Sequence, residues 1–249
     1  MTDNALSIEH VSHGFGTVPV LHDVNLQVPT GEFVAIVGPS GCGKTTLLNV
    51  IAGHITPTTG KVERTGVLRT IYQTDGLFPW LTARQNIAMG FNGANSPTPK
   101  SAEVEGMLKL VGLSAFGDHF PHQLSGGMRQ RVELARALSG KSDILLMDEP
   151  FSALDFQTRL RMRRELIRLL QEIPKTVIFV THDIEEAVQL ADRIVVLTDR
   201  PSTIQREIRV GVQHPRDPAE AEMLYLLNAT LDALGLRDAA TDIEALNVA

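Results

Sequence analysis

The hydrophobic pattern of the chain predicts a fold in which strands and helices alternate. Continuous apolar runs, which are typical of strands buried on both faces, occur at Phe33–Val37 and at residues 144–147 and 176–181. Helical patterns follow the first two runs, at Lys44–Ala52 and at about residues 158–172. Parallel strands joined by helices are the architecture that this order favours, so we expect an α/β fold with a mainly parallel core.

Further strands are expected on either side of this core. Apolar residues alternate with polar ones at residues 6–11 and 24–28, as in half-buried strands, and a last strand is expected at Arg193–Leu197. Gly53 directly follows the first helix and is a suitable C-terminal cap. The tail from residue 218 to the end is predicted to be helical.

A glycine-rich segment between the first buried strand and its helix matches G-x-x-x-x-G-K-[ST]. Its residues are Gly38, Pro39, Ser40, Gly41, Cys42, Gly43, Lys44 and Thr45, and Thr46 follows. In such a loop, backbone N–H groups surround phosphate oxygens and the next helix directs its N-terminus at the same anion. Lys44 would reach the β- and γ-phosphates, and Thr45 would ligate Mg²⁺. A plain strand-to-helix turn is the alternative, and it does not explain the Lys-Thr pair.

Two carboxylates close a later buried strand. Asp148 and Glu149 follow residues 144–147, at the end of a strand where ligands bind in open α/β sheets. If the chain stays extended here, adjacent side chains point opposite ways, so Asp148 would face the metal and Glu149 the attacking water. The alternative is a pair of solvated acids, which the phosphate loop makes less plausible.

Composition narrows the choice of function. The chain has 249 residues and a formal net charge of −6, which argues against a nucleic-acid binder. One cysteine, Cys42, excludes an internal disulfide and fits a reducing compartment, and we interpret it as a small filler of the loop. The N-terminus lacks a signal-peptide pattern and no apolar stretch is long enough to span a bilayer, so we expect a cytoplasmic protein.

A second glycine-containing motif makes the prediction specific. Ser125, Gly126 and Gly127 lie within Leu-Ser-Gly-Gly-Met-Arg-Gln and open a helix that is expected to run to about Leu138, with Ser125 as its N-cap. Glycine costs about 1 kcal/mol relative to alanine inside a helix, so two of them suggest close backbone approach to a phosphate. The segment resembles the signature motif of ABC ATPases, and the resemblance extends over nearly the whole chain.

The resemblance implies roles for further residues. Phe15 lies where the family has an aromatic residue that stacks on adenine, and Gln73 matches the glutamine that senses Mg²⁺ and the γ-phosphate. His182 matches the histidine that contacts the γ-phosphate, and residues 152–155 match a loop that crosses between subunits. The implied cofactors are ATP and Mg²⁺, with Glu149, His182 and Gln73 as catalytic residues and Thr45, Gln73 and Asp148 as metal ligands.

The resemblance also implies an assembly. Two copies face each other head to tail, and each ATP lies between the phosphate loop of one copy and Ser125 and Gly127 of the other. We therefore expect a homodimer on the cytoplasmic side of the membrane, bound to permease subunits and, through them, served by an extracytoplasmic solute-binding protein. One ABC ATPase domain is expected at residues 1–235, with a helical lobe inserted at about 90–140 and a short tail at 236–249.

Three classes of P-loop protein remain as alternatives. The first is a transporter subunit. The second is a soluble ABC ATPase of DNA repair or translation, which would carry tandem cassettes or a long insertion. The third is an unrelated kinase or GTPase, which would lack the signature. A single cassette without such an insertion favours the first.

Segments around Trp80, Gln157 and Arg200 resemble importers of the nitrate, sulfonate, taurine and bicarbonate group, which also includes carriers of thiamine-precursor pyrimidines. Ser202 departs from that group, which often has glycine there. The apolar segment 77–81 either packs under the helical lobe or presents part of its surface to a short permease helix. A basic run, which we interpret as a solvated helix face, consists of Arg159, Arg161, Arg163, Arg164 and Arg168.

Overall fold

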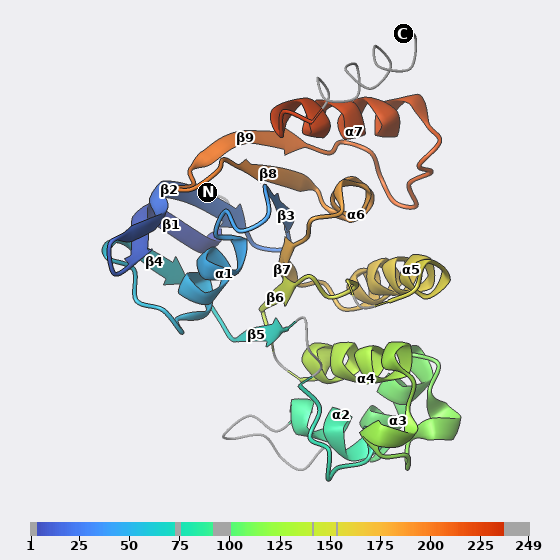
Figure 1. Cartoon of the computed structure of the whole chain (residues 1–249). Coiled ribbons are helices and arrows are strands. Elements are labelled where there is room, and N and C mark those ends of the chain that lie inside the picture. Colours follow the sequence, from blue (N-terminus) through green and yellow to red (C-terminus); the bar gives the residue numbers. More distant parts are fainter. Residues whose placement is uncertain (1–3, 73–75, 92–100, 141, 153, 237–249) are drawn as a thin grey trace, which may run out of the picture. The chain divides into compact units, whose positions relative to one another are not determined.

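The computed structural model describes residues 4–72, 76–91, 101–140, 142–152 and 154–236. The chain forms two compact units (Figure 1). The first unit consists of residues 1–65 and 177–249, and the second of residues 66–176. Both contain strands and helices, so the α/β class predicted from the hydrophobic pattern is confirmed. The predicted limits of the ATPase domain and its lobe stay a prediction.

The first unit begins with an antiparallel sheet. Its strands, in the order β2-β1-β4, are β1 (Asn4–Phe15), β2 (Val18–Pro29) and β4 (Thr59–Arg64). The predicted strands at residues 6–11 and 24–28 lie inside β1 and β2. Their alternation reflects burial, since Leu6, Ile8 and Val11 are buried between more exposed neighbours. β4 has almost no buried side chain, so the hydrophobic pattern does not reveal it.

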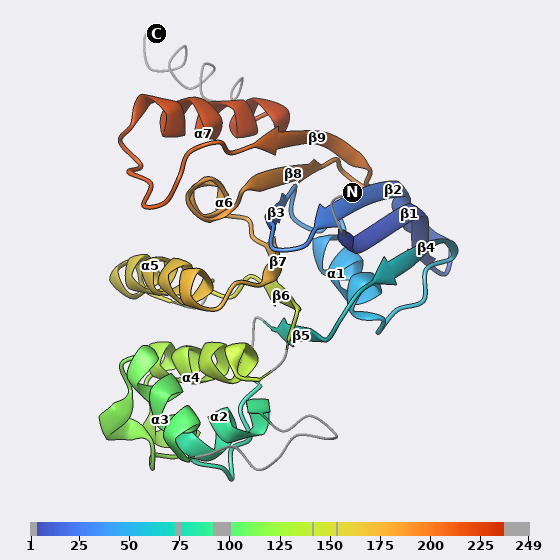
Figure 2. The same cartoon turned by 180° about the vertical axis from the view of Figure 1, so that it is seen from behind.

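The first unit also holds the parallel strands predicted from the apolar runs. β3 (Phe33–Val37) lies between β7 (Thr176–Val180) and β8 (Arg193–Leu197) and is parallel to both. Every residue of the three strands is buried, which explains their continuous hydrophobicity. β9 (Ile204–Arg209) adds an antiparallel edge next to β8. The helices of this unit are α1 (Lys44–Ala52), α6 (Ile184–Leu190) and α7 (Ala221–Ala233) (Figure 2).

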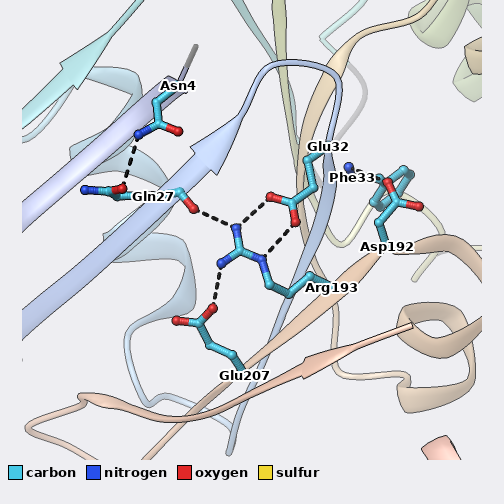
Figure 3. Close-up of polar contacts among 7 residues, drawn as sticks. All are labelled: Asn4, Gln27, Glu32, Phe33, Asp192, Arg193 and Glu207. Carbon is cyan, nitrogen blue, oxygen red and sulfur yellow. Dashed lines mark hydrogen bonds and ion pairs between the residues drawn. The ribbon is translucent and has the colours of Figure 1, made fainter. Parts of the chain in front are cut away.

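One buried arginine ties the two sheets of the first unit together (Figure 3). The Arg193 guanidinium donates to both carboxylate oxygens of Glu32, at 3.0 and 2.6 Å, and to the Glu207 carboxylate at 2.5 Å. It also donates to the backbone carbonyl of Gln27 on β2, at 2.6 Å. Burial acts to lower the pKa of Arg193, but the hydrogen bonds to Glu32 and Glu207 outweigh it and raise the pKa. The side chain therefore stays charged inside the fold.

The second unit is mainly helical. It contains the parallel pair β5 (Leu68–Ile71) and β6 (Ile144–Asp148). Its helices are α2 (Ala83–Phe91), α3 (Ser101–Leu110), α4 (Gly126–Leu138) and α5 (Phe156–Glu172), with short 3₁₀ turns η1 (Ser114–Phe116) and η2 (Pro121–Gln123). α4 packs against α2 and α3 (Figure 1). Within the described part of the chain, none of the helices has the length and apolar character needed to span a bilayer.

The basic run on α5 is not uniformly solvated. The side chain of Arg163 is only 4% exposed, so the interpretation of the whole run as a solvated face is wrong at this position. Arg161, Arg164 and Arg168 are exposed, as expected. The helix also begins two residues before its predicted start, because the Asp155 carboxylate caps it by accepting a hydrogen bond from the backbone N–H of Thr158 at 3.0 Å.

Candidate functional site

The phosphate loop connects β3 to α1, as the motif predicts. Gly43 is the N-cap of α1 and has φ 116°, a value that side-chain-bearing residues rarely adopt. A Cβ atom at this position would lie 2.7 Å from Cγ1 of Val20, so the loop packs directly on β2. α1 spans the predicted residues and ends at Gly53, whose φ of 82° confirms the expected cap.

Lys44 is held inside its own loop. Its side chain is 7% exposed, and its ammonium donates to the carbonyl oxygens of Gly38 at 2.8 Å and Pro39 at 2.9 Å. Thr45, the second residue of α1, is exposed, and Thr46 is half-buried. A buried cation beside backbone N–H groups at a helix N-terminus is suited to binding a phosphate.

A buried serine, Ser202, which sequence reasoning did not assign to the site, joins the phosphate loop to β2. The hydroxyl of Ser202 lies 2.6 Å from the carbonyl oxygen of Cys42 and 3.0 Å from that of Val20, and the residue is fully buried. Cys42 is also buried, and burial raises the pKa of its thiol, which fits its interpretation as a filler of the loop. The signal available in the sequence was the departure of Ser202 from glycine.

His182 and the phosphate loop both lie at the carboxyl ends of neighbouring parallel strands. His182 follows β7, which pairs with β3 so that Ile36 lies opposite Val180, and both strands run in the same direction. The turn at His182 is fixed on both sides. The Thr181 hydroxyl donates to the Glu186 carboxylate at 2.7 Å and accepts from the N–H of Asp183 at 3.0 Å. The imidazole itself is exposed.

Phe15 stands at the turn of the β1–β2 hairpin. It pairs with Val18, two residues before Val20, which packs on the phosphate loop. Its side chain is 55% exposed, and its ring meets the His13 imidazole edge-on with centroids 4.9 Å apart. An exposed aromatic face on the hairpin that covers the loop is suited to stacking against a planar base.

In the second unit, the two carboxylates lie at the carboxyl end of β6, one within the strand and one after it. Asp148 is the last residue of β6 and is 8% exposed. Glu149 has φ 45°, so the strand does not continue through it and the argument from extended alternation is wrong. The turn is closed by Ser152, whose N–H and hydroxyl donate to the Glu149 carbonyl at 3.2 and 3.0 Å. Left-handed backbone at a non-glycine residue is typical of functional sites.

The signature motif opens α4 as expected. Ser125 is its N-cap and accepts a hydrogen bond from the N–H of Met128 at 3.3 Å. Gly126 and Gly127 form the first turn. A Cβ on Gly127 would lie 2.8 Å from Cγ2 of Thr158 at the start of α5, whereas one on Gly126 would meet nothing within 4 Å. Close packing on Thr158 explains the glycine at position 127. Gly126 leaves the backbone accessible at the N-terminus of the helix.

The predicted site residues thus fall into two groups. The first unit holds the phosphate loop, His182 and Phe15, and the second holds Asp148, Glu149 and the signature motif. Gln73 lies outside the described residues. The oxygen donors predicted for the metal, the Thr45 hydroxyl and the Asp148 carboxylate, are of the type that Mg²⁺ prefers. Among the described residues there is no group of three His, Cys, Asp or Glu side chains that could hold a metal ion, and a Mg²⁺ held partly by phosphate does not need one.

Comparison with known proteins agrees with this arrangement. The family model described as "ABC transporter" matches residues 21–152. The aliphatic sulfonates import ATP-binding protein SsuB 2 of Pseudomonas syringae is 47% identical over 80% of this chain and 84% of its own. The nitrate import ATP-binding protein NrtD of Synechocystis is 44% identical (79% and 77%), and the taurine import ATP-binding protein TauB of Jannaschia is 40% identical (82% and 82%).

A solved structure supports the same assignment. The dimeric bacterial ABC transporter cassette MJ0796 superposes with a TM-score of 0.71 at 34% identity, over 84% of this chain and all of that one. The same cassette in a post-hydrolysis state with ADP and Pi gives a TM-score of 0.70. The family match covers more than half of the chain, and each of these relatives exceeds 30% identity over more than two thirds of it. This chain therefore belongs to the ABC transporter family, as one of its ATP-hydrolysing, ATP-binding subunits.

Proposed function

We propose that this chain energises import of a small polar solute of the nitrate, sulfonate, taurine or bicarbonate class. The observation that carries the proposal is the 40–47% identity to import ATP-binding proteins for sulfonate, nitrate and taurine, over about four fifths of each chain. The segments around Trp80, Gln157 and Arg200 favour the same group. The soluble DNA-repair or translation alternative finds no support in these relatives.

Each residue of the proposed site has a role in binding or hydrolysing ATP. Lys44 and the loop N–H groups hold the β- and γ-phosphates, and Thr45 and Asp148 are the Mg²⁺ ligands, with Gln73 as a third. Mg²⁺, when bound, neutralises phosphate charge. Glu149 orients and deprotonates the attacking water, and His182 donates to the γ-phosphate as charge develops there. Phe15 stacks on adenine.

The proposed assembly is a homodimer that docks on permease subunits at the cytoplasmic side of the membrane. The accessible N-terminus of α4, with Ser125, Gly126 and Gly127, contacts the γ-phosphate held by the partner's phosphate loop. Each chain then supplies half of each composite site, so hydrolysis depends on closure of the dimer. A solute-binding protein outside the membrane delivers the solute, and no nucleic acid takes part.

An apolar surface in the second unit is the proposed permease contact. Trp80 is 69% exposed and lies beside Phe78, with ring centroids 5.6 Å apart. The guanidinium of Arg136 lies over the Phe78 ring, with its carbon 5.6 Å from the ring centroid, and Leu77 is buried. An anchored aromatic that presents most of its surface to solvent is suited to receive a short permease helix.

Gene deletion combined with solute uptake tests the proposal. Cells lacking the gene should lose uptake of one of labelled nitrate, taurine, alkanesulfonate, bicarbonate or aminopyrimidine, and the wild-type gene should restore it. A Glu149→Gln gene should not restore uptake, since the chemistry requires that carboxylate. Unchanged uptake of all five solutes, with loss of export of another compound, would refute import and leave the ATPase assignment standing.

A further inference from the structure

The second unit contains a cavity of about 480 Å³ that the proposed ATP site does not use. It is bounded by the end of α3 and the turn that follows it, by Arg131 of α4, and by residues 158–168 of α5. We refer to it as the basic pocket. The cationic residues that line it are Lys109, Arg131, Arg161, Arg164 and Arg168.

The charge of the basic pocket is opposite to that of the chain. Among the described residues, five cationic side chains line it with a single carboxylate, that of Glu165, whereas the whole chain has a net charge of −6. Glu165 is already engaged, since its carboxylate accepts from Arg168 at 2.6 Å. The lining is therefore strongly positive even after its own acid is counted.

Two of the arginines are fixed to the wall of the pocket by backbone carbonyls. Arg131 donates to the carbonyl of Val111 at 3.1 Å, and Arg168 donates to that of Leu110 at 2.7 Å. Burial lowers the pKa of Arg131; the charge of Glu165 acts against this, and the like charge of Arg161 adds to the lowering. An added anion would relieve this repulsion between like charges.

The other three cations are not neutralised within the fold. Among the residues that the structure describes, no hydrogen bond or ion pair joins Lys109, Arg161 or Arg164 to another side chain, and all three are exposed. Guanidinium groups bind phosphate through paired N–H donors. Arg161 and Arg164 are therefore particularly suited to binding phosphate oxygens. The basic run on α5 thus has a use beyond solvation.

The pocket also has an apolar side. Val111 and Met162 line it and are each 2% exposed, and Leu110, the last residue of α3, lines it as well. A cavity of this volume, with an apolar wall and a few converging charges, is of the size and character of small-molecule sites. We infer that the basic pocket binds a small phosphate-bearing molecule, at a site separate from the phosphate loop.

Titration calorimetry with inorganic pyrophosphate tests this inference. All proteins carry Lys44→Ala, so that the phosphate loop contributes little to binding. We expect saturable binding that weakens as salt is raised and that falls at least about tenfold in Arg161→Ala/Arg164→Ala, which removes two charged hydrogen-bonding partners. The control, Arg206→Ala/Arg209→Ala, removes two exposed charges from β9 and should change affinity less than about twofold. Glu165→Gln, which removes the one carboxylate, should tighten binding.

Three results would overturn the inference: no saturable binding, an equal loss in the two double variants, or weaker binding by Glu165→Gln. A fourth would redirect it to the membrane surface, namely binding of phosphatidylglycerol vesicles that depends on Arg161 and Arg164 with no binding of pyrophosphate. Far-UV circular dichroism checks that each variant folds. If the alanine variant does not, Arg161→Gln/Arg164→Gln retains most of the side-chain stem and tests the same charges.

Discussion

Arg193→Met should destabilise the first unit, because it leaves buried acceptors without their donor. The side chain of Arg193 is 9% exposed and that of Glu32 15%, so this ion pair is almost entirely withdrawn from water. Removing one member of a buried pair costs about 3–5 kcal/mol, mostly because the remaining charge is stranded. The Glu207 carboxylate is 41% exposed and adds less than about 1 kcal/mol.

We therefore expect the free energy of unfolding to fall by about 3–4 kcal/mol. For a chain of this size that corresponds to a midpoint of thermal unfolding roughly 6–16 °C lower. Urea unfolding followed by far-UV circular dichroism measures the change. The matched control is Arg209→Met on the neighbouring strand, where the arginine is exposed; it should change the free energy of unfolding by about 0.5 kcal/mol or less.

A double variant shows how much of the lost stability comes from the stranded charge of Glu32 and how much from the lost contacts of Arg193. If the stranded charge dominates, Arg193→Met/Glu32→Gln should be more stable than Arg193→Met alone. A loss below about 1 kcal/mol in the single variant, or a double variant that is less stable by the sum of both single losses, would refute this reasoning.

The remaining predictions concern the phosphate loop and the permease contact. Ser202→Ala should lower stability by about 1–2 kcal/mol in urea unfolding and weaken ATP binding, because the Cys42 carbonyl loses its donor; unchanged ATP affinity would contradict this support role. Gly43→Ala should abolish ATP binding measured by equilibrium dialysis, since the added Cβ would lie 2.7 Å from Val20 in a backbone conformation that alanine avoids; normal binding would show that the loop can relax. Trp80→Ala should reduce solute uptake more than the ATP turnover of the isolated subunit, and equal losses would favour simple packing.

The sequence predicts the buried framework well because burial leaves a strong pattern there. β3, β7 and β8 are buried throughout, and α1 has a phosphate-loop start and a glycine end, so both kinds of element agree with the prediction. β4 and β9 are mostly exposed and leave no such pattern. α2 begins at Ala83, shortly after the apolar segment 77–81, and the hydrophobic pattern does not mark this start.

The site is predictable to the extent that local motifs define it. The phosphate loop and the Ser125 cap depend on neighbouring residues, and both are found as expected. The turn at Glu149 and the contact of Ser202 with Cys42 depend on backbone conformation and on residues 160 positions apart, which spacing does not reveal. The burial of Arg163 likewise depends on packing around α5.

Glu149 is the proposed base that activates water when this chain hydrolyses ATP. The direct measurement is ATP turnover of Glu149→Gln, together with its ATP affinity and its sedimentation with and without ATP. We predict turnover reduced by about a hundredfold or more, retained ATP binding, and an ATP-dependent dimer that persists. Near-normal turnover would contradict the claim, as would a protein that stays monomeric at saturating ATP both alone and with its permease.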